Sequence, residues 1–240
     1  MKILDFGTRA ELDEAAADYV GDLLTRKPHA VIALPTGETP LGLYRNLATR
    51  QHAGVIDCHS ARFFNLDEFE GKGPADEESY AGFLMRHAFE PLGIAPDHLR
   101  LLQGDALDIE AECRAYDEAI DAAGGLDLAV LGLGRNGHVA FNEPGDDWNL
   151  GTHRVALTKT TREAQTGIYQ VASDVPKYGL TMGVATVLSA RKLLLLVSGQ
   201  GKEDAMQALL SGQRDTAHSV TALLVHQDLT VLRDLSSFRS

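Results

Sequence analysis

Short apolar runs alternate with amphipathic segments along most of the chain. Apolar residues follow one another in four short runs, at residues 31–34, 62–66, 126–132 and 192–198. Apolar positions recur at helical spacing in five longer segments, at residues 11–24, 41–53, 79–89, 109–122 and 203–211. Runs that are apolar on both faces are typical of strands in a parallel sheet covered on both sides. The pattern therefore predicts an α/β fold, with a mostly parallel sheet and helices on both faces.

No Pro-rich or Gly/Ser-rich linker, repeat or low-complexity tract interrupts this pattern. Since a chain of 240 residues can bury a sizeable core, we interpret residues 1–240 as one domain. No apolar run approaches the ~20 residues that a membrane-spanning helix needs, and the first residues lack the pattern of a secretory signal. We therefore expect a cytoplasmic protein with no membrane partner.

The net charge narrows the classes of partner. The chain carries 34 acidic and 22 basic residues, a formal net charge of −12 with neutral histidines. A nucleic acid or an anionic membrane would be repelled over most of such a surface, so we expect neither. A small anionic metabolite needs only a few locally placed cations. The two cysteines, Cys58 and Cys113, show no metal-ligand spacing, and we expect no metal.

The residues after each apolar run are the candidates for chemistry, because ligands of parallel α/β sheets bind beyond the carboxyl ends of the strands. Thr36, Gly37 and Thr39 follow the first run and precede a helical pattern. The N–H groups of such a turn and helix start, with two hydroxyls, can hold a phosphate without a formal charge. A simpler interpretation needs no ligand, because Thr39 could cap the helix and Pro40 could occupy its first position.

Asp67 and Glu68 follow the second run, at the expected mouth of the sheet. A carboxylate partly removed from water there has a raised pKa, which suits it to take a proton from carbon. The alternative is a solvated acidic loop, because Glu70, Asp76 and Glu77 follow closely. On this segment alone, the solvated loop is the stronger interpretation.

The third run is followed by Asn136, His138 and Glu143. Imidazole can move a proton near neutral pH, and an amide or acid behind it can fix its tautomer. A histidine in a loop is usually structural, but these neighbours make His138 a candidate proton-transfer group. After the fourth run, Lys202 could reach the same anion as the Thr36 loop, although a plain surface lysine is a common alternative.

Other chemistries lack their parts. The chain contains no GxSxG, GxxxxGK[ST], HExxH or CxxC motif, which disfavours a serine hydrolase, a P-loop NTPase and a zinc enzyme. Residues 132–137 match GxGxxG by letter, but they lie past the middle of the chain and precede His-Val-Ala-Phe-Asn. A dinucleotide site is therefore a poor interpretation.

Taken together, these loops resemble the glucosamine-6-phosphate deaminase (isomerase) family. The matching stretches are LPTGETPLGLY, FFNLDEFEG with ESY at 78–80, LGLGRNGHVAFNEPG, VPKYGLTMG and LLLVSGQGK, in order over nearly the whole chain. The resemblance implies a modified Rossmann-like fold. It also implies conversion of an amino-sugar phosphate to fructose 6-phosphate with release of ammonia, and no metal or organic cofactor.

The resemblance further implies roles for individual residues. Asp67 would be the base that moves the C2 proton of the sugar. His138 would open the pyranose ring, assisted by Glu143 and Asn136. The phosphate would be held by Thr36, Gly37, Thr39 and Lys202. We expect a monomer or a small homo-oligomer, without the C-terminal extension and the allosteric control of the hexameric relatives.

Three positions depart from the family pattern. Asn136 stands where many relatives carry Asp, although an amide can still accept an imidazole N–H. Residues 165–169 read QTGIY where relatives commonly have an arginine, so a phosphate-binding guanidinium is missing there. Glu38 also stands in the phosphate loop. These changes weaken phosphate binding unless Glu38 points away or Arg162 or Lys177 compensates.

Alternatives to a glucosamine-6-phosphate enzyme remain. Residues 124–138 and 194–205 also resemble the galactosamine-6-phosphate branch, so the sugar epimer is open. A 6-phosphogluconolactonase, in which His138 would activate water, is disfavoured by Asp67-Glu68 and by residues 141–145, FNEPG. A sugar-phosphate-binding regulator without catalysis is the third alternative.

Overall fold

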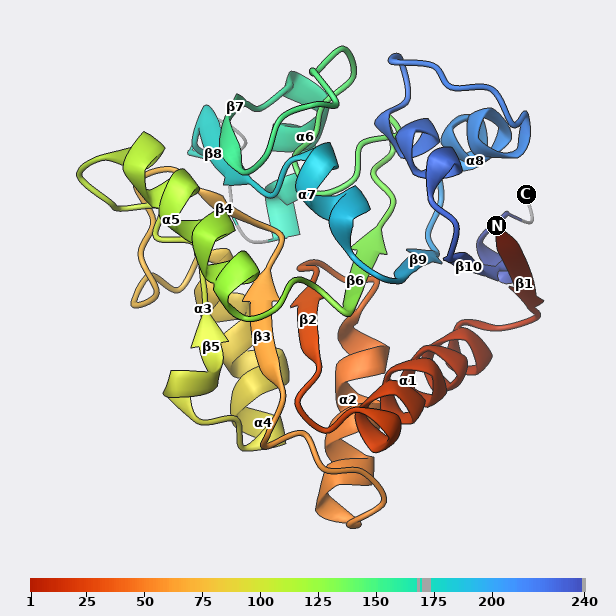
Figure 1. Ribbon diagram of the computed structural model, residues 1–240. Coiled ribbons are helices and arrows are strands. Elements are labelled where there is room, and N and C mark those ends of the chain that lie inside the picture. The colour runs from red at the N-terminus through yellow and green to blue at the C-terminus, as the bar shows by residue number, and fades with distance from the viewer. Residues whose placement is uncertain (168, 170–173, 239–240) are drawn as a thin grey trace.

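The core of the molecule is one parallel sheet of seven strands, in a computed structural model that describes residues 1–167, 169 and 174–238. The strand order is β1-β10-β9-β6-β2-β3-β5, and all neighbours are parallel (Figure 1). The bounds are β1 (Lys2–Phe6), β2 (Val31–Leu34), β3 (Arg62–Asn65), β5 (Leu99–Arg100), β6 (Leu128–Gly132), β9 (Leu193–Val197) and β10 (Leu229–Asp234). All residues of β2 and β9 are buried, as their continuous apolar runs predict.

Helices cover both faces of this sheet, which confirms the predicted α/β class (Figure 1). One face packs on α1 (Arg9–Arg26), α2 (Leu41–His52), α3 (Tyr80–Leu84) and α4 (Glu90–Leu92). The other face packs on α5 (Ile109–Ala122), α7 (Val184–Ser189) and α8 (Glu203–Leu210). Successive residues of a strand point to opposite faces, so Ile32 joins the first core and Ala33 the second.

A second, smaller sheet lies beyond the first and was not predicted. It consists of β4 (Asp67–Phe69), β8 (Tyr178–Thr181) and β7 (His153–Ala156), paired antiparallel in the order β4-β8-β7. Phe69, Tyr80 and Phe141 pack together beside it. These strands read DEF, YGLT and HRVA, so they contain no continuous apolar run and are too short to show a period, and the sequence pattern carries no signal for them. This sheet places Asp67 opposite Thr181.

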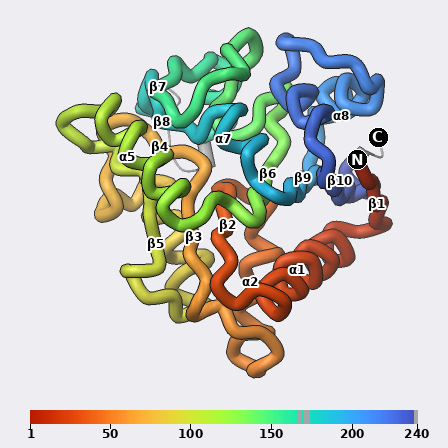
Figure 2. The backbone as a smooth tube through the Cα atoms, viewed as in Figure 1, coloured from red at the N-terminus to blue at the C-terminus, as the bar shows by residue number. Residues whose placement is uncertain are grey.

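The remaining elements are short. They are α6 (Lys159–Glu163), a π-helical turn (Met85–Phe89) and 3-10 turns at Pro96–His98, Ala164–Gly167, Ser219–Val225 and Leu235–Phe238. The π turn continues α3, so the helix predicted at 79–89 is present with a changed winding. The first and last strands, β1 and β10, pair side by side (Figure 2). Among the described residues, no helix is long and apolar enough to cross a membrane.

Candidate active site

Four loops that carry the predicted residues follow β9, β6, β2 and β3, which are consecutive strands of the sheet. Parallel strands end at the same edge, so these loops lie side by side. Lys202 follows β9, His138 follows β6 and Thr36 follows β2. Asp67 follows β3 as the first residue of β4. The candidate residues therefore lie at the carboxyl ends of neighbouring parallel strands, as expected.

The loop after β2 is shaped as a turn. Gly37 has φ +98°, a left-handed conformation that favours glycine. Tyr44 donates a hydrogen bond to the carbonyl of Pro35, and the Thr36 side chain hydrogen-bonds with Tyr80. Buried tyrosines of α2 and α3 therefore fix the start of this loop.

Thr39 does not cap the helix that follows. The N-cap of α2 is Pro40, which has no side chain to cap with, so the simple helix-start interpretation of Thr39 is wrong. Its hydroxyl instead lies 3.5 Å from Nζ of Lys202. This contact joins the loop after β2 to the loop after β9.

Lys202 is a buried cation, with only 9% of its surface exposed. Its ammonium donates to the carbonyl of Ser198 as well as to Thr39. Burial and the charges of Arg9 and Arg135 lower its pKa to about 8, while the charge of Glu38 acts in the opposite direction. The alternative interpretation of Lys202 as a surface lysine is therefore wrong. Lys202 is a desolvated cation beside two hydroxyl-bearing loops.

Arg9 is a residue of this region that sequence reasoning missed. It is the first residue of α1, and its guanidinium donates to the carbonyls of Thr39 (2.5 Å) and Glu38 (2.9 Å) and to Oγ of Ser198 (3.0 Å). Its Nε donates to Asp13 at 2.8 Å. A helix-start arginine carries no local signal for such a role. Its contacts are with a loop 30 residues further along the chain.

The cations beside Lys202 differ from those the sequence suggested. Arg9 and Arg135 act on its pKa, whereas the sequence offered Arg162 or Lys177 as cations that could compensate for the missing arginine. Glu38 is exposed, yet its charge still acts on Lys202. The arginine-free stretch 165–169 includes residue 168, which lies outside the described residues.

Asp67 is buried, with 6% of its surface exposed. Its Oδ1 has no hydrogen-bond partner among the described residues. Burial, and then the charge of Glu68, raise the pKa of Asp67 well above its ordinary value. The solvated acidic loop is therefore the wrong interpretation, and this carboxyl group has the desolvation expected of a base.

Glu68 anchors the strand that carries Asp67. Its carboxylate accepts hydrogen bonds from the backbone N–H groups of Phe69 (2.8 Å), Tyr80 (2.9 Å) and Ala81 (2.8 Å). Two of these N–H groups open α3, where an anion is favoured by the helix dipole. Burial raises the pKa of Glu68 to about 7 although the three bonds lower it. Glu68 thus holds β4 against α3, directly beside Asp67.

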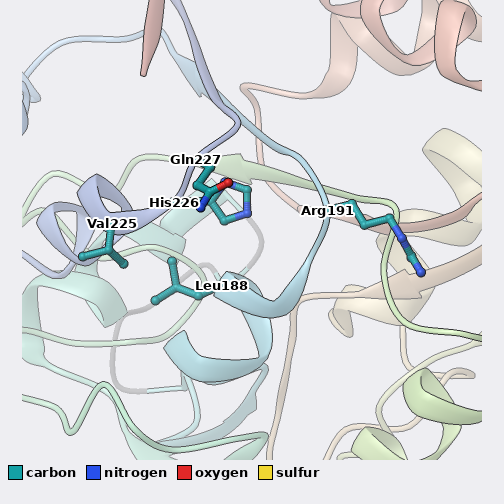
Figure 3. Close-up of a pocket in the computed structure, with 5 residues that line it drawn as sticks. All are labelled: Leu188, Arg191, Val225, His226 and Gln227. Atoms are coloured by element: carbon teal, nitrogen blue, oxygen red, sulfur yellow. The ribbon is translucent and has the colours of Figure 1, made fainter.

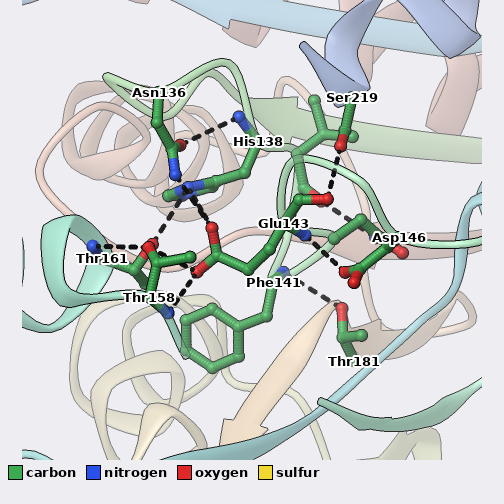
Figure 4. A network of polar contacts seen from close by, with 11 residues as sticks. Asn136, His138, Phe141, Glu143, Asp146, Thr158, Thr161, Thr181 and Ser219 are labelled. Atoms are coloured by element: carbon green, nitrogen blue, oxygen red, sulfur yellow. Dashed lines mark hydrogen bonds and ion pairs between the residues drawn. The ribbon is translucent and has the colours of Figure 1, made fainter. Parts of the chain in front are cut away.

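Asn136 acts on Glu143 rather than on the imidazole (Figure 4). Its Nδ2 donates to Oε2 of Glu143 at 2.9 Å, and its Oδ1 accepts the backbone N–H of His138 at 3.2 Å. The expectation that this amide would accept an imidazole N–H is therefore wrong. Oε2 of Glu143, a residue only 3% exposed, lies 3.8 Å from Nδ1 of His138.

Two threonines of the α6 region complete the surroundings of His138 (Figure 4). Oγ1 of Thr161 lies 3.3 Å from Nδ1 of the ring. Thr158 caps α6 and donates from its N–H (3.1 Å) and its hydroxyl (3.2 Å) to Oε1 of Glu143. The sequence around Thr158 is compatible with a helix N-cap, but no local sequence pattern predicts that Thr158 or Thr161 lies near His138.

The imidazole of His138 is held neutral. Burial lowers its pKa, the charge of Glu143 opposes this, and the charge of Lys202 lowers the pKa further. Because Nδ1 faces a carboxylate and a hydroxyl, we assign the ring proton to Nδ1. Nε2 is then unprotonated and can act as a base.

Hydrogen bonds connect the His138 loop to the strand pair that bears Asp67. The N–H of Phe141 donates to Oγ1 of Thr181 at 3.1 Å, and Thr181 is the residue opposite Asp67. Nδ2 of Asn142 donates to the carbonyl of Met182 at 2.9 Å. The two candidate proton-transfer groups therefore lie on one connected framework.

A surface cavity of about 290 Å³ lies elsewhere, lined by Leu188, Arg191, Val225, His226 and Gln227 (Figure 3). Arg191 precedes β9 and Gln227 precedes β10, so this cavity is at the amino end of the strands. It contains none of the residues described above. Within the described residues, no group of three or more His, Cys, Asp or Glu side chains is placed to hold a metal ion.

Comparison with known proteins gives consistent matches over nearly the whole chain. The family model for glucosamine-6-phosphate isomerases/6-phosphogluconolactonase matches residues 8–232. The glucosamine-6-phosphate deaminase of Thermoanaerobacter sp. (strain X514) is 38% identical over 98% of this chain and 92% of its own. Glucosamine-6-phosphate deaminase 1 of Bacillus subtilis (strain 168) is also 38% identical, over 98% of this chain and 97% of its own.

Solved structures agree with these matches. A monomeric glucosamine-6-phosphate deaminase superposes with a TM-score of 0.96 at 38% identity, over 99% of both chains. A 6-phosphogluconolactonase from Thermotoga maritima superposes with a TM-score of 0.73 at 21% identity, over 97% of both chains. The second likeness concerns the fold alone.

Proposed function

Since the chain belongs to the glucosamine-6-phosphate isomerase/6-phosphogluconolactonase family, we propose that it is an amino-sugar-phosphate deaminase. Its reaction converts glucosamine 6-phosphate and water to fructose 6-phosphate and ammonia. Relatives at 38% identity carry the name of this enzyme over almost their full length. The observation that carries the proposal is the pair of groups on one framework, a desolvated carboxyl at Asp67 and a neutral imidazole at His138.

Ring opening is the task of His138 in this proposal. A neutral Nε2 accepts the proton of the anomeric hydroxyl and returns it to the ring oxygen, so the bond from C1 to that oxygen breaks and a carbonyl forms at C1. Glu143 stabilises the transient imidazolium across 3.8 Å, and Thr161 keeps the ring oriented. Asn136 in turn keeps the Glu143 carboxylate in place.

Asp67 moves the proton between carbons. The carboxylate takes the proton from C2 of the open sugar while a proton of the substrate ammonium passes to O1, so the C1 carbonyl becomes the hydroxyl of an enolamine. The protonated Asp67 then delivers its proton to C1, and the nitrogen lone pair forms an iminium at C2. Water then hydrolyses the iminium to the ketone of fructose 6-phosphate and releases ammonia. The raised pKa of Asp67 makes it a strong base once ionised, and the ammonium of the bound substrate favours that ionised form. No metal or organic cofactor takes part in these steps.

Thr36, Gly37, Thr39 and Lys202 bind the phosphate in this proposal. Three observations support this assignment. Gly37 has a positive φ, Thr39 does not cap α2 and so has its hydroxyl available, and the ammonium of Lys202 lies 3.5 Å from that hydroxyl. An anion between them would also relieve the repulsion that Lys202 experiences from Arg9 and Arg135.

Galactosamine 6-phosphate is the second candidate substrate. Residues 124–138 and 194–205 resemble the galactosamine-6-phosphate branch. In addition, Glu38 departs from the family pattern in the phosphate loop, and its charge acts on Lys202. The reaction and its groups would be the same, because the two sugars differ at C4. We further propose a monomer or small homo-oligomer in the cytoplasm, and light scattering of the pure protein tests the oligomeric state.

The deciding experiment offers glucosamine 6-phosphate, galactosamine 6-phosphate and 6-phosphogluconolactone separately to pure protein. We expect ammonia and a ketose phosphate from the first substrate, in equal amounts. Faster release from the second substrate would reverse the epimer assignment. Faster hydrolysis of the lactone than deamination of either sugar would make the protein a lactonase. Tight binding without turnover would make it a sugar-phosphate-binding regulator.

A further inference from the structure

Arg135 lies at the place where the loops after β6 and β9 approach each other. It follows Gly134 in the loop after β6 and is exposed. Its aliphatic stem packs over Gly201, because a Cβ atom built there would be 3.6 Å from Cδ of Arg135. Gly201 immediately precedes Lys202, so the guanidinium is carried to the same loop as the buried ammonium.

Lys202 lies near the guanidinium groups of Arg9, which pairs with Asp13 at 2.8 Å, and of Arg135, which has no ion pair among the described residues. Burial, and then the charges of Arg9 and Arg135, lower the pKa of Lys202, and the charge of Glu38 opposes this. An arginine without an acidic partner beside a buried ammonium needs a reason in a protein with a formal net charge of −12, where carboxylates are plentiful. An anionic ligand between them supplies one.

The donors of the two arginines are used differently. The Nε of Arg9 donates a hydrogen bond to Asp13, and its terminal nitrogens donate to Oγ of Ser198 and to the carbonyls of Glu38 and Thr39. Arg9 therefore positions the loop after β2. Arg135, within the described part of the chain, makes no hydrogen bond or ion pair, and its electrostatic interaction is with Lys202. A guanidinium with its whole donor fork available matches two oxygens of one phosphate.

We infer that Arg135 binds the phosphate of the substrate together with Lys202, and so replaces the guanidinium that relatives carry in the segment equivalent to residues 165–169. Arg135 is a binding residue for a phosphorylated sugar. This inference rests on the proposed function for the identity of the ligand. It predicts that recognition of the phosphate group depends on the β6 loop.

The test measures binding without turnover. Glucitol 6-phosphate has no carbonyl and no amine to react, so calorimetric titration reports phosphate recognition alone. Arg135→Met retains the stem over Gly201 and removes the charge. We expect its Kd to rise about 10- to 100-fold, the effect of losing a charge-assisted bidentate contact. Arg135→Lys should recover part of the affinity, because it restores the charge without the fork.

Arg114→Met is the matched control, since Arg114 is an exposed arginine on α5. It should bind glucitol 6-phosphate as the wild type does. In the deamination assay, Arg135→Met should raise KM by the same factor and leave kcat within about 2-fold, the pattern of a contact equal in ground state and transition state. Unchanged affinity in Arg135→Met, or no binding by the wild type, would overturn the inference.

These outcomes separate the inference from the proposed function. If the wild type binds glucitol 6-phosphate and releases no ammonia from either amino sugar, the proposed reaction fails while the role of Arg135 is still measured. If ammonia is released and Arg135→Met binds normally, the reaction stands and the role of Arg135 is wrong.

Discussion

The imidazole of His138 lies directly against Gly134. A Cβ atom at position 134 would be 2.4 Å from Nε2 of the ring and 2.5 Å from its two neighbouring carbons. Such distances are far inside van der Waals contact, so the ring occupies the space that any other residue would fill. The orientation of the proposed proton-transfer atom therefore depends on a missing side chain four residues earlier.

Gly134→Ala should displace the ring and remove most of the activity. We expect kcat to fall about 100-fold, the low end of what general acid–base catalysis contributes. Gly132→Ala is the matched control, because a Cβ atom there meets nothing within 4 Å. Steady-state deamination rates of the two variants, with thermal unfolding to check the fold, make the comparison. Wild-type kcat in Gly134→Ala would contradict the assigned position of the ring.

Asp67→Asn and His138→Gln should separate the two proton transfers. In Asp67→Asn, exchange of the substrate C2 proton with deuterated solvent should disappear, because an amide cannot take that proton. In His138→Gln, turnover from the closed ring should fall about 100-fold or more, while exchange from the open fraction of the sugar continues. Proton NMR of the C2 signal measures both. Wild-type exchange in Asp67→Asn would assign the base elsewhere.

Thr161→Val should weaken catalysis without removing it. The hydroxyl 3.3 Å from Nδ1 of His138 is lost, so the ring retains only the Glu143 carboxylate at 3.8 Å. We expect kcat to fall about 10-fold, equivalent to one neutral hydrogen bond, with KM little changed. Thr160→Val is the control, because Thr160 is exposed on the same helix. Equal rates in the two variants would show that Thr161 does not position the ring.

Asp67→Asn should also stabilise the folded protein at neutral pH. Burial raises the pKa of Asp67 in the folded protein well above its ordinary value, so the folded state retains a proton that the unfolded state has lost. Stability of the wild type therefore falls as the pH rises through this window. Each unit of raised pKa corresponds to about 1.4 kcal/mol where the carboxyl is ionised in both states.

Urea unfolding of both proteins at several pH values measures this difference. The free energies of unfolding should converge below a pH of about 4, where the carboxyl is protonated in both states, and diverge above it. A difference independent of pH would mean that the amide changes packing rather than charge.

Glu38→Gln should strengthen phosphate binding. Glu38 is exposed and its charge acts on Lys202 with the sign that opposes an incoming anion. We expect KM for the sugar phosphate to fall about 2- to 5-fold at low salt, the range of an exposed charge interaction. The gain should shrink as ionic strength rises, since screening acts first on exposed charges. A higher KM would show that the carboxylate contacts the substrate favourably.

The large sheet was predictable because its strands are buried on both faces. A run such as LLLLV at 193–197 is readable without knowing its partners. The loop with His138 was predictable for a related reason, since an imidazole with an acid and an amide directly after a buried strand is an uncommon combination. The helix at 109–122 ends where its pattern ends.

The rest depends on contacts between distant segments. Arg9 meets Thr39, and Thr158 meets Glu143, across parts of the chain whose local patterns are those of ordinary helix starts. The burial of Asp67 comes from a three-residue strand with no period of its own. Asp67 was selected by the resemblance of the whole chain, because its own segment favoured the solvated loop.

Thr181 accepts the N–H of Phe141 and faces Asp67 across the small sheet, whereas the Thr36 loop and Lys202 belong to other strand ends. The small sheet and the loop after β6 thus position Asp67 and His138, whereas Thr36, Thr39 and Lys202 of the proposed phosphate site lie on the loops after β2 and β9. Substitutions such as those at 38 and 165–169 can accumulate at the phosphate site while the reaction centre is inherited intact. This architecture can therefore change its substrate while it keeps the same proton-transfer groups.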